Sequence, residues 1–407
     1  MRKLATLLSI FGFIALSSCQ QEDLLDVPLR PSYLVGYPKE SGIDIGFISR
    51  SGLLPGALSS LPVKGNKPDS YDIFVSTDAK AEFTRVSTLF TDGTRLSIEN
   101  LTNGTPYYVT VAGNKKGLAS VQYDTIMVVP SKPKLLTKGS WVYDHAENIS
   151  FSPTTDSAAY ITRYIYSNWR NTPDLYIFPY YTNEPRRIEH NVKECEWSPS
   201  GRLIAFSRRL DANDPSGKDL QLSVYDLGKD TTINLPVFST TLGSMTFSPN
   251  GEWIYYIDGD ENENDLVWRI KIDGSFKEPV IGRQSFALEK SSNFVIDKIT
   301  LSPHNEEVYF SGSENNYQVI YRHSLKSKTS QILFDDPWSS YSPSISPDGQ
   351  KLAFFSTRSG ATEVWTYDLS QSSFKQRTGS PLGGWYGLEI EWVTNSELNI
   401  GNSRLQL

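Results

Sequence analysis

A set of aromatic and imidazole side chains stands in polar stretches of the chain, where a ligand could reach them. Flat tryptophan and tyrosine rings offer an apolar face and a hydrogen-bonding edge, which suits sugar rings or a partner peptide. Packing between structural elements is the alternative role for any single ring. The candidate ligand-binding residues are Trp141, Tyr143, His145, Trp169, His190, Trp338, Tyr341, Trp385 and Tyr386.

Patterns for catalysis or metal binding are sparse. No Gly-x-Ser-x-Gly elbow occurs, and two Cys with four His exclude a Cys/His zinc cluster. In the acidic run 258–265, Asp258, Asp260 and Asn262 match the first ligand spacing of a calcium loop, but Glu263 stands where that loop needs glycine. A solvated hairpin loop is the preferred interpretation of the run. We predict no catalytic residue, no metal site and no cofactor.

The first residues are typical of an export signal. Arg2 and Lys3 precede an apolar run over 4–16 that is too short for an ordinary membrane span. The following Leu16-Ser17-Ser18-Cys19 resembles the lipobox of bacterial lipoproteins. That resemblance implies a signal peptide over 1–18 and a lipidated Cys19 that holds the protein on a membrane.

A short acidic tether over 19–30 follows the predicted anchor. Its Gln20-Gln21-Glu22-Asp23 resembles the surface-export signal of Bacteroidetes lipoproteins, which implies an outer-membrane protein facing the cell exterior, with the periplasmic face as the alternative. Cys195 is then left without a cysteine partner, and we predict a small buried side chain there.

The composition narrows the fold and the partners. The 407 residues include 39 basic and 46 acidic side chains, with a formal net charge of −7, so nucleic acid is not an expected partner. Aromatic residues make up 12% of the chain, beside 28 Gly and 23 Pro. These figures favour short strands and turns, and they exclude a wholly disordered chain or a multi-span membrane protein.

One phrase, apolar-Ser-Pro, recurs along residues 131–407. Its serines stand at 152, 198, 248, 302 and 346, and most copies precede a Gly-containing turn and an apolar strand. A period of about 45 residues with room for four short strands is typical of β-propeller blades. The second copy, for example, predicts strands over 203–206, 221–226 and 231–235. The phrase itself is predicted to be structural, because Pro starts a tight turn and Asp or Asn bonds its backbone.

The best copy, Ser346-Pro347-Asp348-Gly349 with a later Tyr367-Asp368-Leu369, resembles the TolB-type repeat, a WD40-like family. A degenerate sixth copy near 391–395 lacks a fourth strand, and residues 133–137 resemble the missing outer strand. Joining both chain ends in one blade would leave no free sheet edge. We therefore predict an all-β fold in which a six-bladed TolB-like propeller over 131–407 follows a smaller sandwich.

Residues 31–130 form that sandwich in our prediction. Leu101, Gly104, Thr105 and Tyr107 resemble the corner between strands E and F of a fibronectin type III domain. The resemblance implies that the Tyr107 hydroxyl bonds back to the backbone. Asn103 replaces the usual proline of this corner, and no tryptophan marks strand B, where Phe47 is the substitute. We predict a spacer role for this domain.

The predicted function is binding. The propeller resemblance implies that the links between blades gather on one face around the channel, where the candidate residues would meet a ligand. We predict a non-enzymatic envelope lipoprotein whose propeller binds a glycan or a partner protein. A TolB-like scaffold for envelope protein complexes is one alternative. A carbohydrate-active enzyme of the lyase type is another, although His145 and His190 are too few for a His-rich metal site.

Overall fold

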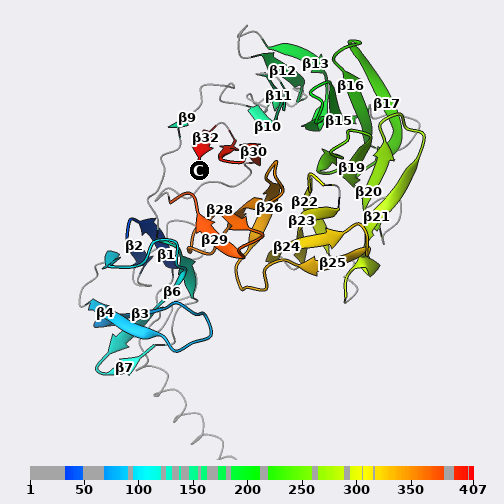
Figure 1. Cartoon of the computed structure of the whole chain (residues 1–407). Coiled ribbons are helices and arrows are strands. Elements are labelled where there is room, and N and C mark those ends of the chain that lie inside the picture. The colour runs from blue at the N-terminus through cyan, green and yellow to red at the C-terminus, as the bar shows by residue number, and fades with distance from the viewer. Residues whose placement is uncertain are drawn as a thin grey trace, which may run out of the picture. The chain divides into compact units, whose positions relative to one another are not determined.

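The computed structural model describes residues 33–48, 68–89, 95–120, 125–130, 137–138, 146–154, 157–162, 173–179, 185–210, 219–258, 265–287, 294–304, 306–314, 317–379, 389–401 and 403–407. These residues form strands and one short 3₁₀ turn, η1 at Arg283–Ser285, so the described chain is all-β (Figure 1). No helix in the described ranges is long and apolar enough to cross a membrane.

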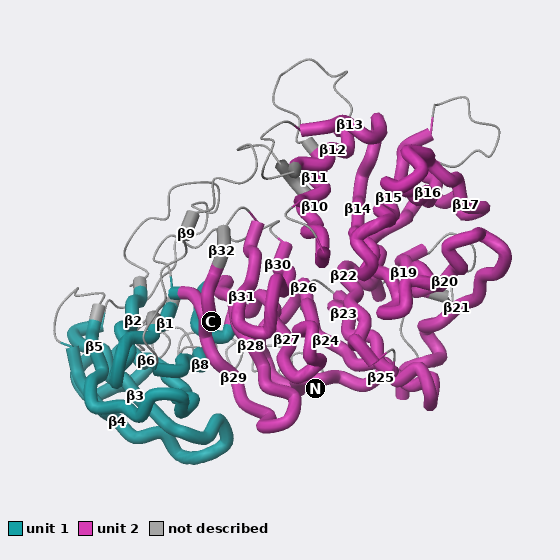
Figure 2. The backbone as a smooth tube through the Cα atoms, turned by 45° about the horizontal axis from the view of Figure 1, so that its top comes forward, with its two compact units in different colours: residues 1–133, 358–361, 379–383 teal, residues 134–357, 362–378, 384–407 magenta. Residues whose placement is uncertain are grey.

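The chain divides into two compact units (Figure 2). The first contains Met1–Pro133 together with two short later segments, Arg358–Ala361 and Gly379–Gly383. The second contains Lys134–Thr357, Thr362–Thr378 and Gly384–Leu407. Each unit is described by itself below.

The first unit is a sandwich of two antiparallel sheets. One sheet has the order β1-β2-β5, and the other has the order β4-β3-β6-β7, with β8 also paired to β6. The strands are β1 (Tyr33–Lys39), β2 (Gly42–Ile48), β3 (Ser70–Ser76), β4 (Thr84–Leu89), β5 (Arg95–Glu99), β6 (Tyr107–Lys115), β7 (Leu118–Ala119) and β8 (Ile126–Val128).

The inner faces of both sheets build one apolar core. Phe47 of β2 is 2% exposed and its ring centroid lies 4.8 Å from that of Tyr71 on β3. Alternating residues of β6, such as Val109 and Val111, complete the core from the other sheet. The hydrogen bond predicted for the corner is present, since the backbone N of Thr102 donates to Tyr107 Oη at 3.1 Å. The fibronectin type III assignment itself stays a prediction.

The second unit is a six-bladed propeller. It consists of six four-stranded antiparallel sheets, five of which follow the chain without interruption. Blade one is β10 (Ala146–Phe151), β11 (Ser157–Thr162), β12 (Leu175–Pro179) and β13 (Arg186–Glu189); blade two is β14 (Val192–Trp197), β15 (Leu203–Arg209), β16 (Leu220–Asp226) and β17 (Thr231–Ser239); blade three is β18 (Met245–Phe247), β19 (Trp253–Ile257), β20 (Asp265–Lys271) and β21 (Lys277–Gly282). Blade four is β22 (Val295–Leu301), β23 (Glu307–Glu314), β24 (Tyr317–Ser324) and β25 (Thr329–Ile332), and blade five is β26 (Ser340–Ile345), β27 (Lys351–Ser356), β28 (Glu363–Asp368) and β29 (Ser373–Gln376).

Blade six joins the two ends of the unit. Its sheet has the order β30-β31-β32-β9, with β30 (Ile390–Thr394), β31 (Glu397–Ile400) and β32 (Ser403–Gln406) from the C-terminus. The outer strand β9 (Thr137–Lys138) pairs with β32 through Thr137 and Arg404. The predicted shared blade is therefore present. The described outer strand begins at the last residue of the predicted range 133–137.

The Ser-Pro phrases form the turns that join the first two strands of a blade. In four copies the backbone N at the start of the second strand donates to the serine Oγ, at 2.9 to 3.1 Å. Asp348 also accepts from Ser346 Oγ at 2.6 Å and from the backbone N of Gln350 at 3.0 Å. Gly349 takes a φ of 71°, which favours glycine. These serines stabilise turns, as predicted.

The strand directions divide the propeller into two faces. Turns between the first and second strands, and between the third and fourth, lie at one end of every blade. We call this end the Ser-Pro face. The segments that link one blade's outer strand to the next blade's inner strand lie at the opposite end, the link face.

Candidate functional site

Most of the predicted binding residues fall on segments without a described position. Cys19, Trp141, Tyr143, His145, Trp169, Trp385 and Tyr386 lie outside the described residues, as does most of the acidic run 258–265. The structure places the remaining three candidates, His190, Trp338 and Tyr341.

His190 and Trp338 both lie on the link face, but not together. His190 is exposed between blades one and two, and its Nδ1 lies 3.1 Å from Asp174 Oδ1. Trp338 is partly buried just before β26, the inner strand of blade five, and its backbone N donates to Asp336 Oδ1. Blades two and five stand opposite each other in a ring of six. A small ligand would therefore not contact both residues.

Tyr341 has a packing environment. It lies within β26, and its ring centroid is 5.6 Å from that of Phe355 on the neighbouring strand. It also packs against the apolar cluster of Ile390, Trp392 and Leu398 from blade six. The ring thus fills space between blades five and six, the alternative role noted for the aromatic candidates.

Asp258 opens the acidic run from a buried position. It is 0% exposed, and Ser239 Oγ donates to its Oδ1 at 2.7 Å. No group of three or more His, Cys, Asp or Glu in the described residues is placed to hold a metal ion. Cys195 is a buried free cysteine, as predicted, and burial raises its pKa well above the usual value.

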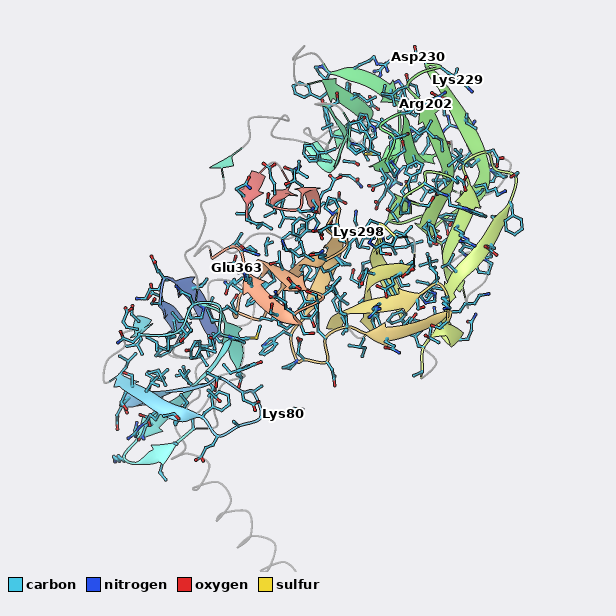
Figure 3. The ribbon with its side chains drawn as sticks, viewed as in Figure 1. Lys80, Arg202, Lys229, Asp230, Lys298 and Glu363 are labelled. Carbon is cyan, nitrogen blue, oxygen red and sulfur yellow. The ribbon has the colours of Figure 1, made fainter. Side chains whose placement is uncertain are left out.

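The inner strands bring a second set of polar residues together that the sequence did not single out. Lys298 of blade four donates from Nζ to Glu389 Oε1 of blade six at 3.2 Å. These blades are not neighbours, so the ion pair crosses in front of blade five, on the axis of the ring. Figure 3 labels Lys298 on this inner side of the propeller. Four glutamates interact electrostatically with Lys298, and we call this set the axial cluster: Glu194, Glu196, Lys298, Glu389 and Glu391.

Blade one connects the glutamates of its two neighbours. Asn148 Nδ2 on β10 donates to Glu194 Oε2 of blade two at 3.1 Å. On the other side, the backbone N of Phe151 donates to Glu391 Oε2 of blade six at 3.1 Å. The axial cluster therefore also joins the inner strands of blades one, two and six.

Three carboxyl groups of the cluster have pKa values above the usual value of glutamate. Desolvation is the largest cause that raises the pKa of Glu194, of Glu391 and of Glu196, the last to about 7. Their side chains keep some accessible surface, but protein groups enclose them on most sides. Burial alone would lower the pKa of Lys298. Three neighbouring carboxylates, Glu389 foremost with Glu196 and Glu194, outweigh burial and raise it.

The cluster could have been found by aligning the copies of the repeat, because its members occupy equivalent positions, here called a column. In each copy, the residues two and four positions before the recurring serine, or before Val393 in the sixth copy, lie on the inner strand of the blade or directly before it. Residues two positions apart in a strand point to the same side of the sheet. In blades one, three and five this column holds Asn, Ser and Thr, whereas blades two and six place two glutamates each and blade four places Lys298. The charged residues become evident only when the equivalent positions of all six blades are compared.

Chemically, the cluster can accept hydrogen bonds from ligand hydroxyls or neutralise a ligand cation. Glu196, with a pKa near 7, also holds an exchangeable proton at neutral pH.

No protein-family model and no curated protein matches the chain. Similar solved structures include TolB from Acinetobacter baumannii, at 11% identity over 86% of this chain and 80% of that chain with a TM-score of 0.45. An auxiliary nutrient binding protein from Bacteroides thetaiotaomicron is similar at 11% identity over 93% and 99%, with a TM-score of 0.46. Oligogalacturonate lyase from Vibrio parahaemolyticus is similar at 10% identity over 74% and 86%, with a TM-score of 0.44. These likenesses concern the fold alone.

Proposed function

We propose that the protein is a non-enzymatic binding lipoprotein of the cell envelope, anchored in the outer membrane through Cys19, with the sandwich as a spacer. Its propeller binds a ligand at the axis, from the link face. The axial cluster supports this proposal. Glutamates with raised pKa values oppose folding at neutral pH, and groups that weaken a fold without filling its core are typical of sites kept for binding.

The charge of the cluster favours a cationic ligand group. Four carboxylates against one ammonium leave an excess of three negative charges when all are ionised. A lysine or arginine side chain from a partner protein would stabilise the ionised carboxylates and recover part of the desolvation energy. A neutral sugar would supply only hydrogen bonds. We therefore propose an envelope protein with a basic segment as the ligand.

Removing two axial charges should weaken this complex. In the double variant Glu196→Gln and Glu391→Gln, the side-chain shapes are kept while two carboxylates are lost. We expect the affinity for a partner captured by crosslinking on intact cells to fall at least about tenfold, a loss of roughly 1.4 kcal/mol. Biolayer interferometry with the purified full-length chain measures the change.

The control is Glu306→Gln, which removes an exposed charge from the Ser-Pro face. It should leave the affinity unchanged. Binding by the wild-type chain should also weaken as salt rises, because exposed parts of an ionic contact are screened. Equal affinities for the wild type and the double variant would contradict the axial site.

A glycan ligand is the second candidate, supported by the position of Trp338. Trp338 is partly buried on the link face, and an indole ring is a typical contact for a sugar. If a glycan is the ligand, Trp338→Ala should abolish most of the retardation of the chain in native gels that contain the matching polysaccharide. Trp253→Ala, on the Ser-Pro face, is the control. Unchanged mobility of the wild type on every polysaccharide tested would count against a glycan.

A further inference from the structure

A cavity of about 550 Å³ lies between blades two and three on the Ser-Pro face. The turns that follow the inner strands of the two blades contribute to its walls, together with the hairpins of their outer strands. Its size falls within the range of ligand-binding pockets. None of the residues that line the cavity belongs to the axial cluster. The cavity opens on the Ser-Pro face, at the opposite end of the blades from the link face.

The cavity exists because two neighbouring Ser-Pro turns stand apart. Between blades one and two, a Cβ placed on Gly201 would lie 1.8 Å from Thr154 Oγ1, so these turns touch. Between blades four and five, a Cβ on Gly349 would lie 3.0 Å from Pro303 Cγ. The equivalent Cβ on Gly251 of blade three would meet nothing within 4 Å. The gap is thus a local departure from the packing seen elsewhere in the repeat.

The carboxylates at the cavity already have their partners. Asp226 accepts from Arg202 Nε at 3.0 Å and from Nη2 at 2.8 Å, and it also accepts the backbone N–H groups of Gly228 and Lys229. Asp273 accepts the backbone N–H of Ser275 at 2.9 Å. With four donors, Asp226 has little capacity left for a ligand.

The cations are less fully engaged. Among the residues that the structure describes, Lys229 Nζ has no hydrogen-bond acceptor. The Arg202 side chain is 56% exposed, and within the same described residues its Nη1 group has no acceptor either. Both belong to blade two and are labelled in Figure 3. Arg202 and Lys229 stand against Asp226 and Asp273 in the cavity lining, and Asp226 is already bound by four donors. The free donors therefore favour an anion.

Apolar side chains form the rest of the site. Leu203, Val224 and Ile272 line the cavity, and Ile233 at its edge is 40% exposed. Ile233 extends the apolar surface to the edge of the cavity, which fits a side chain of a peptide.

We propose that this cavity is a second binding site, which takes an acidic peptide segment of a partner protein. A carboxylate of the segment pairs with Lys229 and with the free donor of Arg202. An adjacent aliphatic or aromatic side chain packs on Ile233 and Leu203. The site lies on the opposite face from the axial cluster and does not depend on it.

A phage-displayed heptapeptide library, panned on the full-length chain in detergent, tests the proposal. We expect selected peptides to combine an acidic residue with a neighbouring aliphatic or aromatic one. In fluorescence anisotropy their affinity should fall at least about tenfold for Lys229→Glu and for Ile233→Asp. Lys326→Glu makes the same charge change at an exposed turn of blade four and should have no effect. The double variant Glu196→Gln and Glu391→Gln should also bind normally, which separates this site from the axial one.

Two results would overturn the proposal. The first is a set of selected peptides without acidic residues, or with affinities that Lys229→Glu leaves unchanged. The second is competition by N-acetyl-leucine at the same concentration as the selected peptide, since the cavity would then be a site for small carboxylates.

Discussion

Replacing Lys298 by methionine is expected to lower the free energy of unfolding by about 3 kcal/mol at pH 8. The substitution removes the ammonium that interacts with four carboxylates of the axial cluster, and of these only Glu194 keeps another nearby cation, Lys193. Breaking a buried ion pair by removal of one partner costs about 3 to 5 kcal/mol. The low end applies here because the Lys298 side chain is 24% exposed. Urea unfolding of the full-length chain measures the loss.

The loss should depend on pH in a defined direction. Glu196 has a pKa raised to about 7, so the folded state binds protons more tightly than the unfolded state does. Its contribution to stability is therefore present at low pH and declines as pH rises from about 4.5 to 7. Without Lys298 the carboxyl groups would hold their protons even more tightly. We expect a small deficit at pH 5 and the full deficit at pH 8.

Lys326→Met is the matched control, because Lys326 is exposed and makes no ion pair within the described residues. It should unfold like the wild type at both pH values. An equal deficit for Lys298→Met at pH 5 and pH 8 would show that lost packing, and not the carboxylate charge, explains the change.

His323 is expected to make the protein sensitive to acid. It is 0% exposed in blade four, with Nδ1 at 2.9 Å from Ser330 Oγ, and burial lowers its pKa to about 4. A lowered pKa means that the unfolded state binds the proton more readily. The contribution of His323 is thus complete above the unfolded pKa of about 6.5 and is lost as pH falls toward 4. A shift from 6.5 to 4 corresponds to about 3 kcal/mol.

The variant His323→Phe isolates this effect. Phenylalanine fills a similar volume but cannot take a proton, so the difference in stability between the variant and the wild type should change by about 3 kcal/mol between pH 7 and pH 4. The comparison between the two proteins matters because the axial glutamates change stability in the opposite sense over part of this range. Parallel stability curves for the two proteins would contradict the assignment to His323.

Local chemistry explains why much of the fold could be predicted. The Ser-Pro turns are stabilised by residues within five positions, as Ser346 and Asp348 illustrate, so the same short phrase forms the same turn in blades two to five. The strands that follow alternate or run apolar over a few residues. The closure by β9 could be anticipated because an open last blade would leave a free sheet edge. The bond from Thr102 to Tyr107 is equally local.

The sites were harder to predict, because their members are far apart in the chain. Lys298 and Glu389 are 91 residues apart and belong to blades that do not touch through their sheets. Each of these residues alone is an ordinary polar position on an alternating strand. The cavity beside Lys229 arises because the Ser-Pro turns of blades two and three stand apart, and no residue type in the sequence predicts this separation. The sequence predicts that Tyr341 binds a ligand because it stands beside a polar segment, but its ring packs between blades five and six.

The repeat therefore determined the kind of blade and the number of blades, because turn and strand formation depend on residues a few positions apart. Only the closed ring decided which charges meet on its axis, how far burial moves their pKa values, and where two neighbouring turns separate. Electrostatic energy depends on distance and on exclusion of water, and in this protein both are set by strands that lie as many as 240 residues apart, as in the contact between Phe151 and Glu391.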